Sequence, residues 1–224
     1  MPGPGSSGTR YRPAGQCRRD ERVMNVERGR DWGRPGPVPN DAVVVESDAE
    51  ASDLVTAARR GGRDLPVIVL PGGDLCRTLG GRGVALPGGS GTRLTVDLGA
   101  ALLDGKIHWF CAHLVARPEF RPGRWWVAAN AAHRGRWNLA PRAHPGDGLL
   151  DILDVNLSGL SWASAWRRLP SGDHVPLPGI RYNRTSSIQH SFDRLTPVRL
   201  DGQSIGRFRD ISVRVEAGAL QVVV

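Results

Sequence analysis

The sequence is short of lysine, cysteine and long apolar runs. Lys106 is its only lysine, and nearly all of its 30 basic side chains are arginines. The three cysteines, Cys17, Cys76 and Cys111, are far apart, so they predict neither a disulfide framework nor a metal site. The sequence has no run of about 18 apolar residues, the length needed to cross a membrane. The N-terminus lacks the apolar core of a signal peptide. These absences predict a cytoplasmic protein.

The charge is basic, with a formal net value of +8. Because the arginine guanidinium bonds phosphate groups with two parallel N–H donors, such a surface suits nucleic acid, anionic lipid or a phosphorylated ligand. An arginine-rich stretch at residues 10–34 would be the nucleic-acid candidate, but the acids Asp20, Glu21, Glu27 and Asp31 dilute its charge. No nucleic-acid-binding motif accompanies it, so we expect no nucleic-acid partner.

The pattern divides the chain into three parts. Residues 1–37 are rich in Gly, Pro, Ser and Arg, which predicts a disordered basic arm. Residues 38–82 read as a strand at 42–46, an amphipathic helix at 47–62 and an apolar strand at 66–70, followed by a short helix. Such β-α-β order predicts parallel strands.

Two caps support the helices of this second part. Ser47 and Glu50 form a capping box at the start of the first helix, and Gly61 and Gly62 end it. Asp74 is the predicted N-cap of the second helix.

Residues 83–224 predict an antiparallel β-sandwich, because strand-length apolar segments alternate with Gly, Pro and Asp turns. One helix is expected at 160–169. The fold class is therefore α+β. The predicted strands lie at 93–103, 106–117, 124–132, 149–157, 197–207 and 210–224.

The glycine-rich turn "LPGGDLCRTLGG", residues 70–81, allows two interpretations. Backbone N–H groups in such a turn between strand and helix bind phosphate, but a tight turn with a capping aspartate explains the same residues. Two Asp-Gly pairs, Asp147–Gly148 and Asp201–Gly202, are typical of hairpin turns. His133 and His144 do not have metal-site spacing.

The order of these motifs resembles the bacterial lipid kinases of the diacylglycerol kinase and sphingosine kinase type. The resemblance covers residues 42–224 and is best at "NLAPRAHPGDGLLDI", with further matches at "VRLDG" and at residues 74–80. It implies a small, truncated α/β remnant of a nucleotide-binding domain followed by a lipid-kinase-like C-terminal antiparallel β-sandwich.

The resemblance also implies functional residues. It places ATP phosphates at Asp48, Gly72, Gly73, Asp74 and Arg77, with Mg²⁺ as the accompanying ion. Asp147 would be the base for the hydroxyl of a lipid or another small molecule. The substrate would lie at Asn130, Arg134 and Arg136. No residue is assigned as a metal ligand.

The sequence departs from the family pattern at the nucleotide site. Where the family has a GGDGT turn, this chain has "ESDAE", which keeps only Asp48 and adds two glutamates. Two glycines remain in the second loop, but its threonine and asparagine are lost, and Gln203 replaces a glutamate. A first β-α-β unit and a helical hairpin within the sandwich are also missing.

Two functions therefore compete. One is ATP-dependent phosphoryl transfer to a lipid hydroxyl. The other is a catalytically inactive relative that binds an anionic lipid, a nucleotide or a protein, with Trp125, Trp126, Trp137 and Phe120 as an apolar contact surface near the cleft. The resemblance leaves open both a homodimer and peripheral contact with an anionic membrane.

Overall fold

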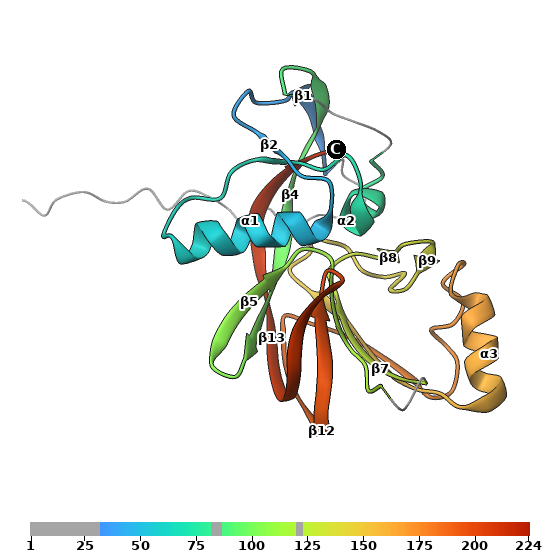
Figure 1. Cartoon of the computed structure of the whole chain (residues 1–224). Helices are drawn as coiled ribbons and strands as arrows, with labels where there is room; N and C mark the ends of the chain where they lie inside the picture. Colours follow the sequence, from blue (N-terminus) through green and yellow to red (C-terminus); the bar gives the residue numbers. More distant parts are fainter. Residues whose placement is uncertain (1–31, 82–86, 120–122) are drawn as a thin grey trace, which may run out of the picture.

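A computed structural model describes residues 32–81, 87–119 and 123–224. A small α/β part lies above a larger antiparallel part, and α3 lies against the side of the larger one (Figure 1). Phe120 and most of the predicted basic arm, residues 1–31, fall outside the described residues. Residues 34–37 of that predicted arm form strand β1 (Arg34–Pro37), which pairs with β4. This pairing adds backbone hydrogen bonds that no local signal at these residues predicts.

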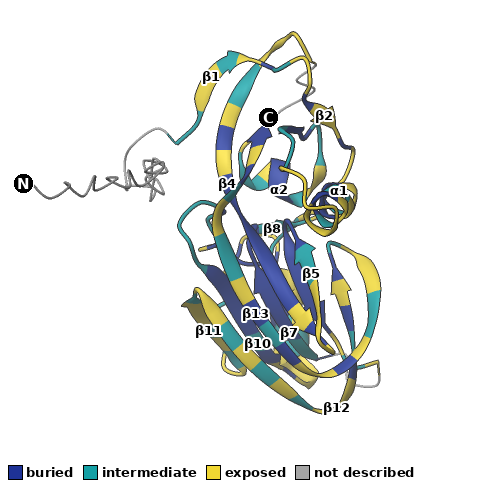
Figure 2. Cartoon of the chain, turned by 90° about the vertical axis from the view of Figure 1, so that its left-hand side faces the viewer, coloured by how far each residue is buried: buried dark blue, intermediate teal, exposed yellow. Residues whose placement is uncertain are grey.

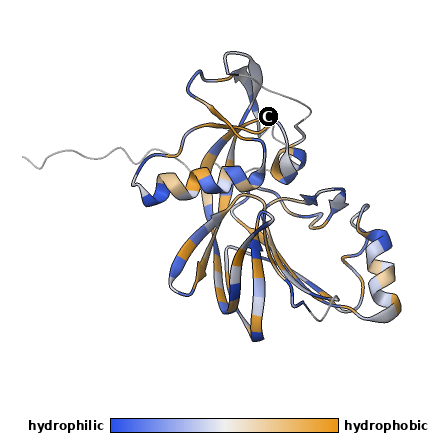
Figure 3. Cartoon of the chain, viewed as in Figure 1, coloured by the Kyte–Doolittle hydropathy of each residue, from blue (hydrophilic) through white to orange (hydrophobic). Residues whose placement is uncertain are grey.

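The α/β part confirms the predicted elements. Strands β2 (Val43–Val44) and β3 (Ile68–Val69) are parallel neighbours, and helix α1 (Asp48–Arg60) connects them. Ser47 caps α1 by accepting the Glu50 N–H at 3.2 Å. Apolar and polar residues alternate along α1, as expected for a helix packed on one side (Figure 3).

The cap predicted for the second helix is wrong. Helix α2 (Gly73–Thr78) has Gly72 as its N-cap and Asp74 inside its first turn. The free N–H groups of this turn are instead bonded by Asp48, which comes from the start of α1. A side chain distant in sequence therefore replaces the local cap.

The larger part is an antiparallel sandwich, as predicted. The path through its hydrogen-bonded strands runs β1-β4-β13-β12-β6-β7-β10-β11, with β5 beside β4, while β8 and β9 form a separate ribbon. Its elements are β4 (Ser90–Leu103), β5 (Lys106–Phe110), β6 (His113–Ala116), β7 (Arg124–Ala129), β8 (His133–Arg134), β9 (Trp137–Asn138), β10 (Leu150–Asn156), α3 (Gly159–Arg168), β11 (Ile180–Thr185), β12 (Ser187–Leu200) and β13 (Gln203–Val223).

Several strands differ from the prediction. Residues 106–117, expected to be one strand, form β5 and β6 with a break at Cys111 and Ala112. Strand β11 and the first half of β12 were not predicted, because each contains only two apolar or aromatic residues, although these alternate with polar ones and are partly buried. The helix expected at 160–169 is confirmed as α3.

Two long strands, β4 and β13, join the α/β part to the sandwich, and the predicted domain boundary at residue 83 stays a prediction. At the end of β13, Val222 pairs in parallel with Ile68 of β3 and antiparallel with Leu94 of β4. Further back, β13 pairs with β12 inside the sandwich. Both β4 and β13 run the length of the molecule and carry buried residues in each half (Figure 2).

Three main apolar clusters form the core. One lies between the α/β helices and the upper ends of β4 and β13, a second fills the sandwich, and a third lies beneath α3. In the sandwich, a Cβ atom at Gly99 would overlap the ring of Phe110 on the neighbouring strand, so the ring fits only against glycine. No helix among the described residues is long and apolar enough to cross a membrane.

Candidate functional site

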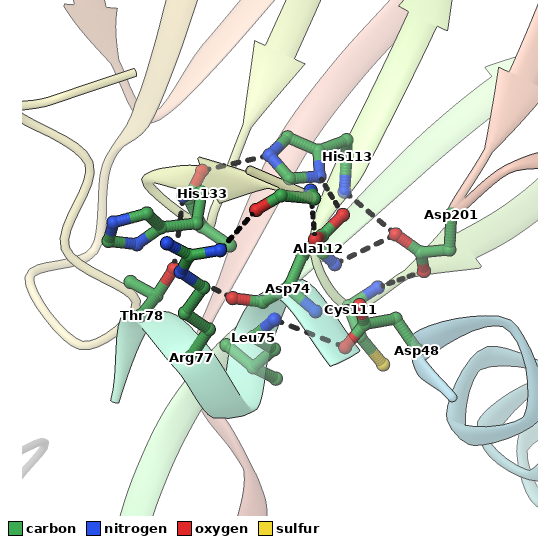
Figure 4. Close-up of polar contacts among 12 residues, drawn as sticks. Asp48, Asp74, Leu75, Arg77, Thr78, Cys111, Ala112, His113, His133 and Asp201 are labelled. Atoms are coloured by element: carbon green, nitrogen blue, oxygen red, sulfur yellow. Dashed lines mark hydrogen bonds and ion pairs between the residues drawn. The ribbon is translucent and has the colours of Figure 1, made fainter. Parts of the chain in front are cut away.

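Three carboxylates meet where the α/β part joins the sandwich (Figure 4). Asp48 begins α1, Asp74 lies in the first turn of α2, and Asp201 lies in the turn between β12 and β13. Around them are Ser52, His113 and the backbone of residues 111–113. The structure thus brings together Asp48, Gly72, Gly73 and Asp74, as the sequence predicted.

Asp48 is buried and bonded to the backbone of α2. Its carboxylate accepts the Asp74 N–H at 2.6 Å and the Leu75 N–H at 3.2 Å. Burial, followed by repulsion from Asp201, raises the pKa of Asp48 to about 7, although its two backbone hydrogen bonds oppose the shift. A group with this pKa changes its charge near neutral pH.

Asp201 accepts more hydrogen bonds than Asp48. Its carboxylate accepts three backbone N–H groups of the turn between β5 and β6, from Cys111 at 2.7 Å, Ala112 at 2.9 Å and His113 at 2.7 Å. The Ser52 hydroxyl on α1 donates a fourth hydrogen bond. Burial raises the pKa of Asp201 against these bonds.

Sequence reasoning missed this role because Asp201 was assigned only to a hairpin. The hairpin itself is confirmed, with a backbone φ of 47° at Asp201. A sequence signal did exist, because "VRLDG" is one of the segments that carry the family resemblance.

Asp74 connects α2 to the β8–β9 ribbon. Its carboxylate accepts the Gly135 N–H at 2.6 Å, while Arg77 donates to the Gly135 carbonyl at 2.7 Å. His113 Nδ1 lies 3.7 Å from the Asp74 carboxylate, and His113 Nε2 lies 2.9 Å from the Ala131 carbonyl. Burial lowers the pKa of His113 to about 3, so the ring is neutral at pH 7 and Nε2 carries its proton.

The predicted phosphate loop does not fit a triphosphate in this arrangement. The N–H groups of α2 already bond the Asp48 carboxylate. A Cβ at Gly73 would lie 2.8 Å from an Asp48 oxygen, which shows how closely that oxygen approaches the loop. Asp48, Asp74 and Asp201 lie near one another, but no group of three His, Cys, Asp or Glu side chains in the described part of the chain is arranged to hold a metal ion.

Asp147 and Asn130 lie in other surroundings. Asp147 accepts the Leu149 N–H at 3.1 Å and pairs with Arg184, which also contacts Asp151. Asn130 is fully buried, and its amide donates to the carbonyls of Asp97 and Cys111 at 2.8 Å each. The structure thus places neither residue among the three carboxylates of the junction, and Asn130 is not accessible to a substrate.

Next to Asp74, a basic and aromatic pocket of 980 Å³ opens between α3, the β8–β9 ribbon and the sandwich. We call it the Arg–Trp pocket. Arg134 and Arg136, both predicted to bind substrate, line it, as does Gly135, whose N–H bonds Asp74. The full lining is Val115, Arg117, Glu119, Trp125, Arg134, Gly135, Arg136, Trp137, Trp162, Trp166, Pro197 and Arg199.

The positive charges of this pocket crowd one another. The guanidinium carbons of Arg117 and Arg134 lie 4.8 and 5.7 Å from the centre of the Trp125 ring. Burial lowers the pKa of Arg134, Asp74 raises it, and the nearby Arg199 and Arg117 lower it further. Among the described residues, no carboxylate lies within ion-pair distance of these three arginines, whereas Glu119 pairs with Arg207.

An apolar slot continues from the same pocket beneath α3. Trp125, Trp137, Trp162 and Trp166 line both the pocket and the slot. The slot has a volume of 40 Å³, close to the share of one water molecule in the liquid. Its remaining lining is Val127, Leu139, Leu153, Val155, Leu157, Ala165, Leu169, His174 and Ile180.

Trp126 is not part of this surface. It is buried, and its ring stacks on His190 with 5.2 Å between ring centres, on the side of the strand away from the pocket. Adjacent residues on a strand point to opposite faces, which explains why Trp125 reaches the pocket and Trp126 does not.

The comparisons with known proteins agree with the fold. A family model described as the YegS C-terminal NAD kinase beta sandwich-like domain matches residues 113–224, half of the chain. Among curated proteins no match was found.

Two solved structures from Bacillus anthracis strain Sterne are similar. A proposed diacylglycerol kinase aligns over 82% of this chain and 78% of its own length, with 14% identity and a TM-score of 0.57. A second diacylglycerol kinase covers 82% and 76%, with 16% identity and a TM-score of 0.52. The two TM-scores, both above 0.5, establish a shared fold. The family match over half of the chain shows that the chain belongs to the YegS C-terminal NAD kinase beta sandwich-like family.

Proposed function

We propose that this lipid-kinase-like protein binds a lipid with an anionic head group in the Arg–Trp pocket. The observation that carries the proposal is that the same four tryptophans line both a basic pocket and an apolar slot. An amphiphile has these two chemistries in the same order, a charged head followed by an aliphatic chain.

The head group would lie at Arg134, Arg117 and Arg199. These side chains repel one another, so an anion between them would gain their attraction and relieve their repulsion. A charge-assisted hydrogen bond contributes about 1.5–3 kcal/mol. The size of the pocket, 980 Å³, falls within the range of sites for small ligands.

The chain of the lipid would enter between Trp137 and Trp162. Each buried methylene contributes about 0.8 kcal/mol. Since the slot holds only 40 Å³, chain binding requires α3 to move outward from the sheet. The rings that would then contact the chain already touch one another, with 6.3 Å between the centres of Trp125 and Trp162 and 4.7 Å between those of Trp137 and Trp166.

A titration followed by tryptophan fluorescence tests this proposal. The probes are octanoyl lysophosphatidic acid below its micelle concentration, glycerol 3-phosphate and monooctanoylglycerol. We expect octanoyl lysophosphatidic acid to bind at least tenfold more tightly than glycerol 3-phosphate, which lacks the acyl chain, or monooctanoylglycerol, which lacks the phosphate. Equal affinity for all three would contradict the proposal.

Two variants locate the binding site. Arg199→Gln removes one charge from the pocket and should weaken lysophosphatidic acid binding about tenfold. The matched control is Arg63→Gln, an exposed arginine in the loop after α1 that does not line the pocket. Equal effects of the two variants would place the binding elsewhere.

Phosphoryl transfer to a lipid hydroxyl is the second function we propose to test, and it requires the Asp48 carboxylate to move away from the N–H groups of α2 so that a phosphate can bind there. It is favoured by the position of the pocket, because Gly135 lines it and bonds Asp74, one of the three clustered carboxylates. The assay measures transfer of the labelled γ-phosphate from Mg·ATP to diacylglycerol in mixed micelles. Activity that survives Asp147→Asn but is lost in Asp48→Asn would assign the chemistry to the carboxylate cluster. Absence of transfer would leave lipid binding as the function.

A further inference from the structure

Helix α3 presents apolar and basic side chains to solvent without any acidic residue. Leu160 in its first turn is 90% exposed, and Trp166 is 39% exposed. Arg167 and Arg168 lie in its last turn and are also exposed. From residue 157 to residue 172 the sequence contains no aspartate or glutamate. An apolar side chain as exposed as Leu160 is costly in water, so this face calls for a partner.

The surface beside α3 continues the same chemistry. The ring centre of Trp166 lies 4.7 Å from that of Trp137 on β9, which brings the β8–β9 ribbon against the helix. Arg136 in this ribbon is exposed, and Arg117 and Arg199 follow across the mouth of the pocket. The one acidic residue in the pocket lining, Glu119, is neutralised by Arg207. Apart from the ion pair of Glu119 with Arg207, the charged side chains described at the rim of the pocket are therefore arginines.

We propose that α3 and the rim of the Arg–Trp pocket form a docking surface for an anionic membrane. Leucine and tryptophan side chains on a helix enter the boundary between head groups and acyl chains, while arginines on the same helix contact anionic head groups. The inference rests on the proposed lipid binding. It adds the route, in which a lipid passes from the bilayer directly into the pocket.

Charge decides the occupant of this surface. A second copy of the chain placed face to face would bring Arg136, Arg167 and Arg168 against their own counterparts, and like charges in contact repel. An anionic bilayer offers the opposite charge over an extended plane and accepts a single protruding leucine without a preformed cavity.

Co-sedimentation with vesicles tests the proposal. One set contains phosphatidylcholine alone, and the other contains phosphatidylcholine and phosphatidylglycerol in equal amounts. The whole protein should sediment with the anionic vesicles and remain free with the neutral ones. Binding should weaken as salt is raised, because the attraction is screened. Equal sedimentation with both vesicle types would overturn the proposal.

Variants on α3 identify the contact. Leu160→Glu should weaken vesicle binding. The double variant Arg167→Gln with Arg168→Gln should also weaken it, by about fivefold or more for each arginine removed. The matched control is Leu195→Glu, because Leu195 is 61% exposed on β12, away from α3. If Leu195→Glu weakens binding as much as Leu160→Glu does, α3 is not the docking surface.

The titration with octanoyl lysophosphatidic acid separates this inference from the proposed function. None of Leu160, Arg167 and Arg168 lines the pocket, so their variants should keep wild-type affinity for the soluble lipid. Soluble-lipid binding without vesicle binding would overturn the docking surface and leave the pocket intact. Vesicle binding that is lost in Leu160→Glu, without soluble-lipid binding, would support the docking surface and contradict the pocket.

Discussion

At the scale of single residues, the Asp48 side chain decides what the glycine-rich loop at residues 70–81 can bind. Its carboxylate supplies the negative charge at the start of α2, where the sequence resemblance places phosphate. The local sequence predicted that Asp48, Gly72, Gly73 and Asp74 would meet, because the ends of parallel strands lie at one edge of a sheet. It could not predict that their hydrogen bonds would be satisfied internally, since that depends on how α1 approaches α2.

The raised pKa of Asp48 predicts a pH-dependent stability. The folded-state value of about 7 exceeds the ordinary value of 3.8, so between these pH values the unfolded chain has lost a proton that the folded chain keeps. The stabilisation from Asp48 is thus present below the ordinary value and is lost as the pH rises to about 7. The full shift corresponds to a loss on the order of 4 kcal/mol.

Denaturant titrations of the wild type and Asp48→Asn at about pH 4 and about pH 8 measure this loss. The free energy of unfolding of the wild type should fall relative to that of the variant as the pH rises. His113 has the opposite sign, since its pKa is lowered, but it is common to both proteins and cancels in the difference. A difference independent of pH would contradict the burial of Asp48.

The contact between Asp48 and Gly73 predicts a costly substitution. Gly73 has a φ of 96°, and a Cβ there would lie 2.8 Å from an Asp48 oxygen. Gly73→Ala should therefore reduce the free energy of unfolding by about 2–4 kcal/mol, from backbone strain and the displaced carboxylate. The control is Gly105→Ala, with a φ of 75° and open space around its Cβ, which should cost about 1 kcal/mol. Equal costs would mean that Asp48 does not hold this position.

At the scale of elements, local signals predicted α1, α3 and the parallel pair β2–β3, because caps and apolar periodicity act within a few residues. The break between β5 and β6 was not predicted. Residues 106–117 contain no Gly, Pro or Asp to mark a turn, and the break occurs where three backbone N–H groups turn toward Asp201, about ninety residues later in the chain. The same distance hid the role of Asp201 from sequence reasoning.

Two matched turns test the role of Asp201. Asp104 and Asp201 each precede a glycine and have φ values of 45° and 47°, but Asp104 is exposed, whereas Asp201 is half-buried and its carboxylate accepts four hydrogen bonds. Asp201→Ala would leave buried N–H groups without acceptors and should cost more than about 3 kcal/mol. Asp104→Ala should cost within about 1 kcal/mol. Thermal or denaturant unfolding compares them, and similar losses would show that only the turn geometry matters.

At the scale of the whole molecule, β4 and β13 connect two parts that the sequence divides. Val222 and Val223 of β13 pair with β3 on one side and with β4 on the other. This end of β13 therefore belongs to the sheet of the α/β part. The sequence pattern turns from helix and strand to mainly strands after residue 83, which predicted a boundary there. Pairing between distant segments leaves no such mark in the sequence.

A core substitution in the α/β part should therefore destabilise the sandwich as well. Val222 is fully buried, and Val222→Ala should cost about 2–3 kcal/mol. Fluorescence of the sandwich tryptophans and far-ultraviolet circular dichroism should report the same shifted midpoint. Val44→Ala, at an exposed edge position, should shift it little. Separate transitions for the two probes would show that the parts fold independently.

The crystal structure of the protein with octanoyl lysophosphatidic acid tests the central claim most directly. We expect electron density for the lipid phosphate between Arg134 and Arg199 and for the acyl chain between Trp137 and Trp162, with α3 displaced outward from the sheet. Density for the phosphate at Gly72 and Gly73, with the Asp48 carboxylate moved away, would contradict lipid binding in the Arg–Trp pocket and support phosphate binding by the loop at residues 70–81.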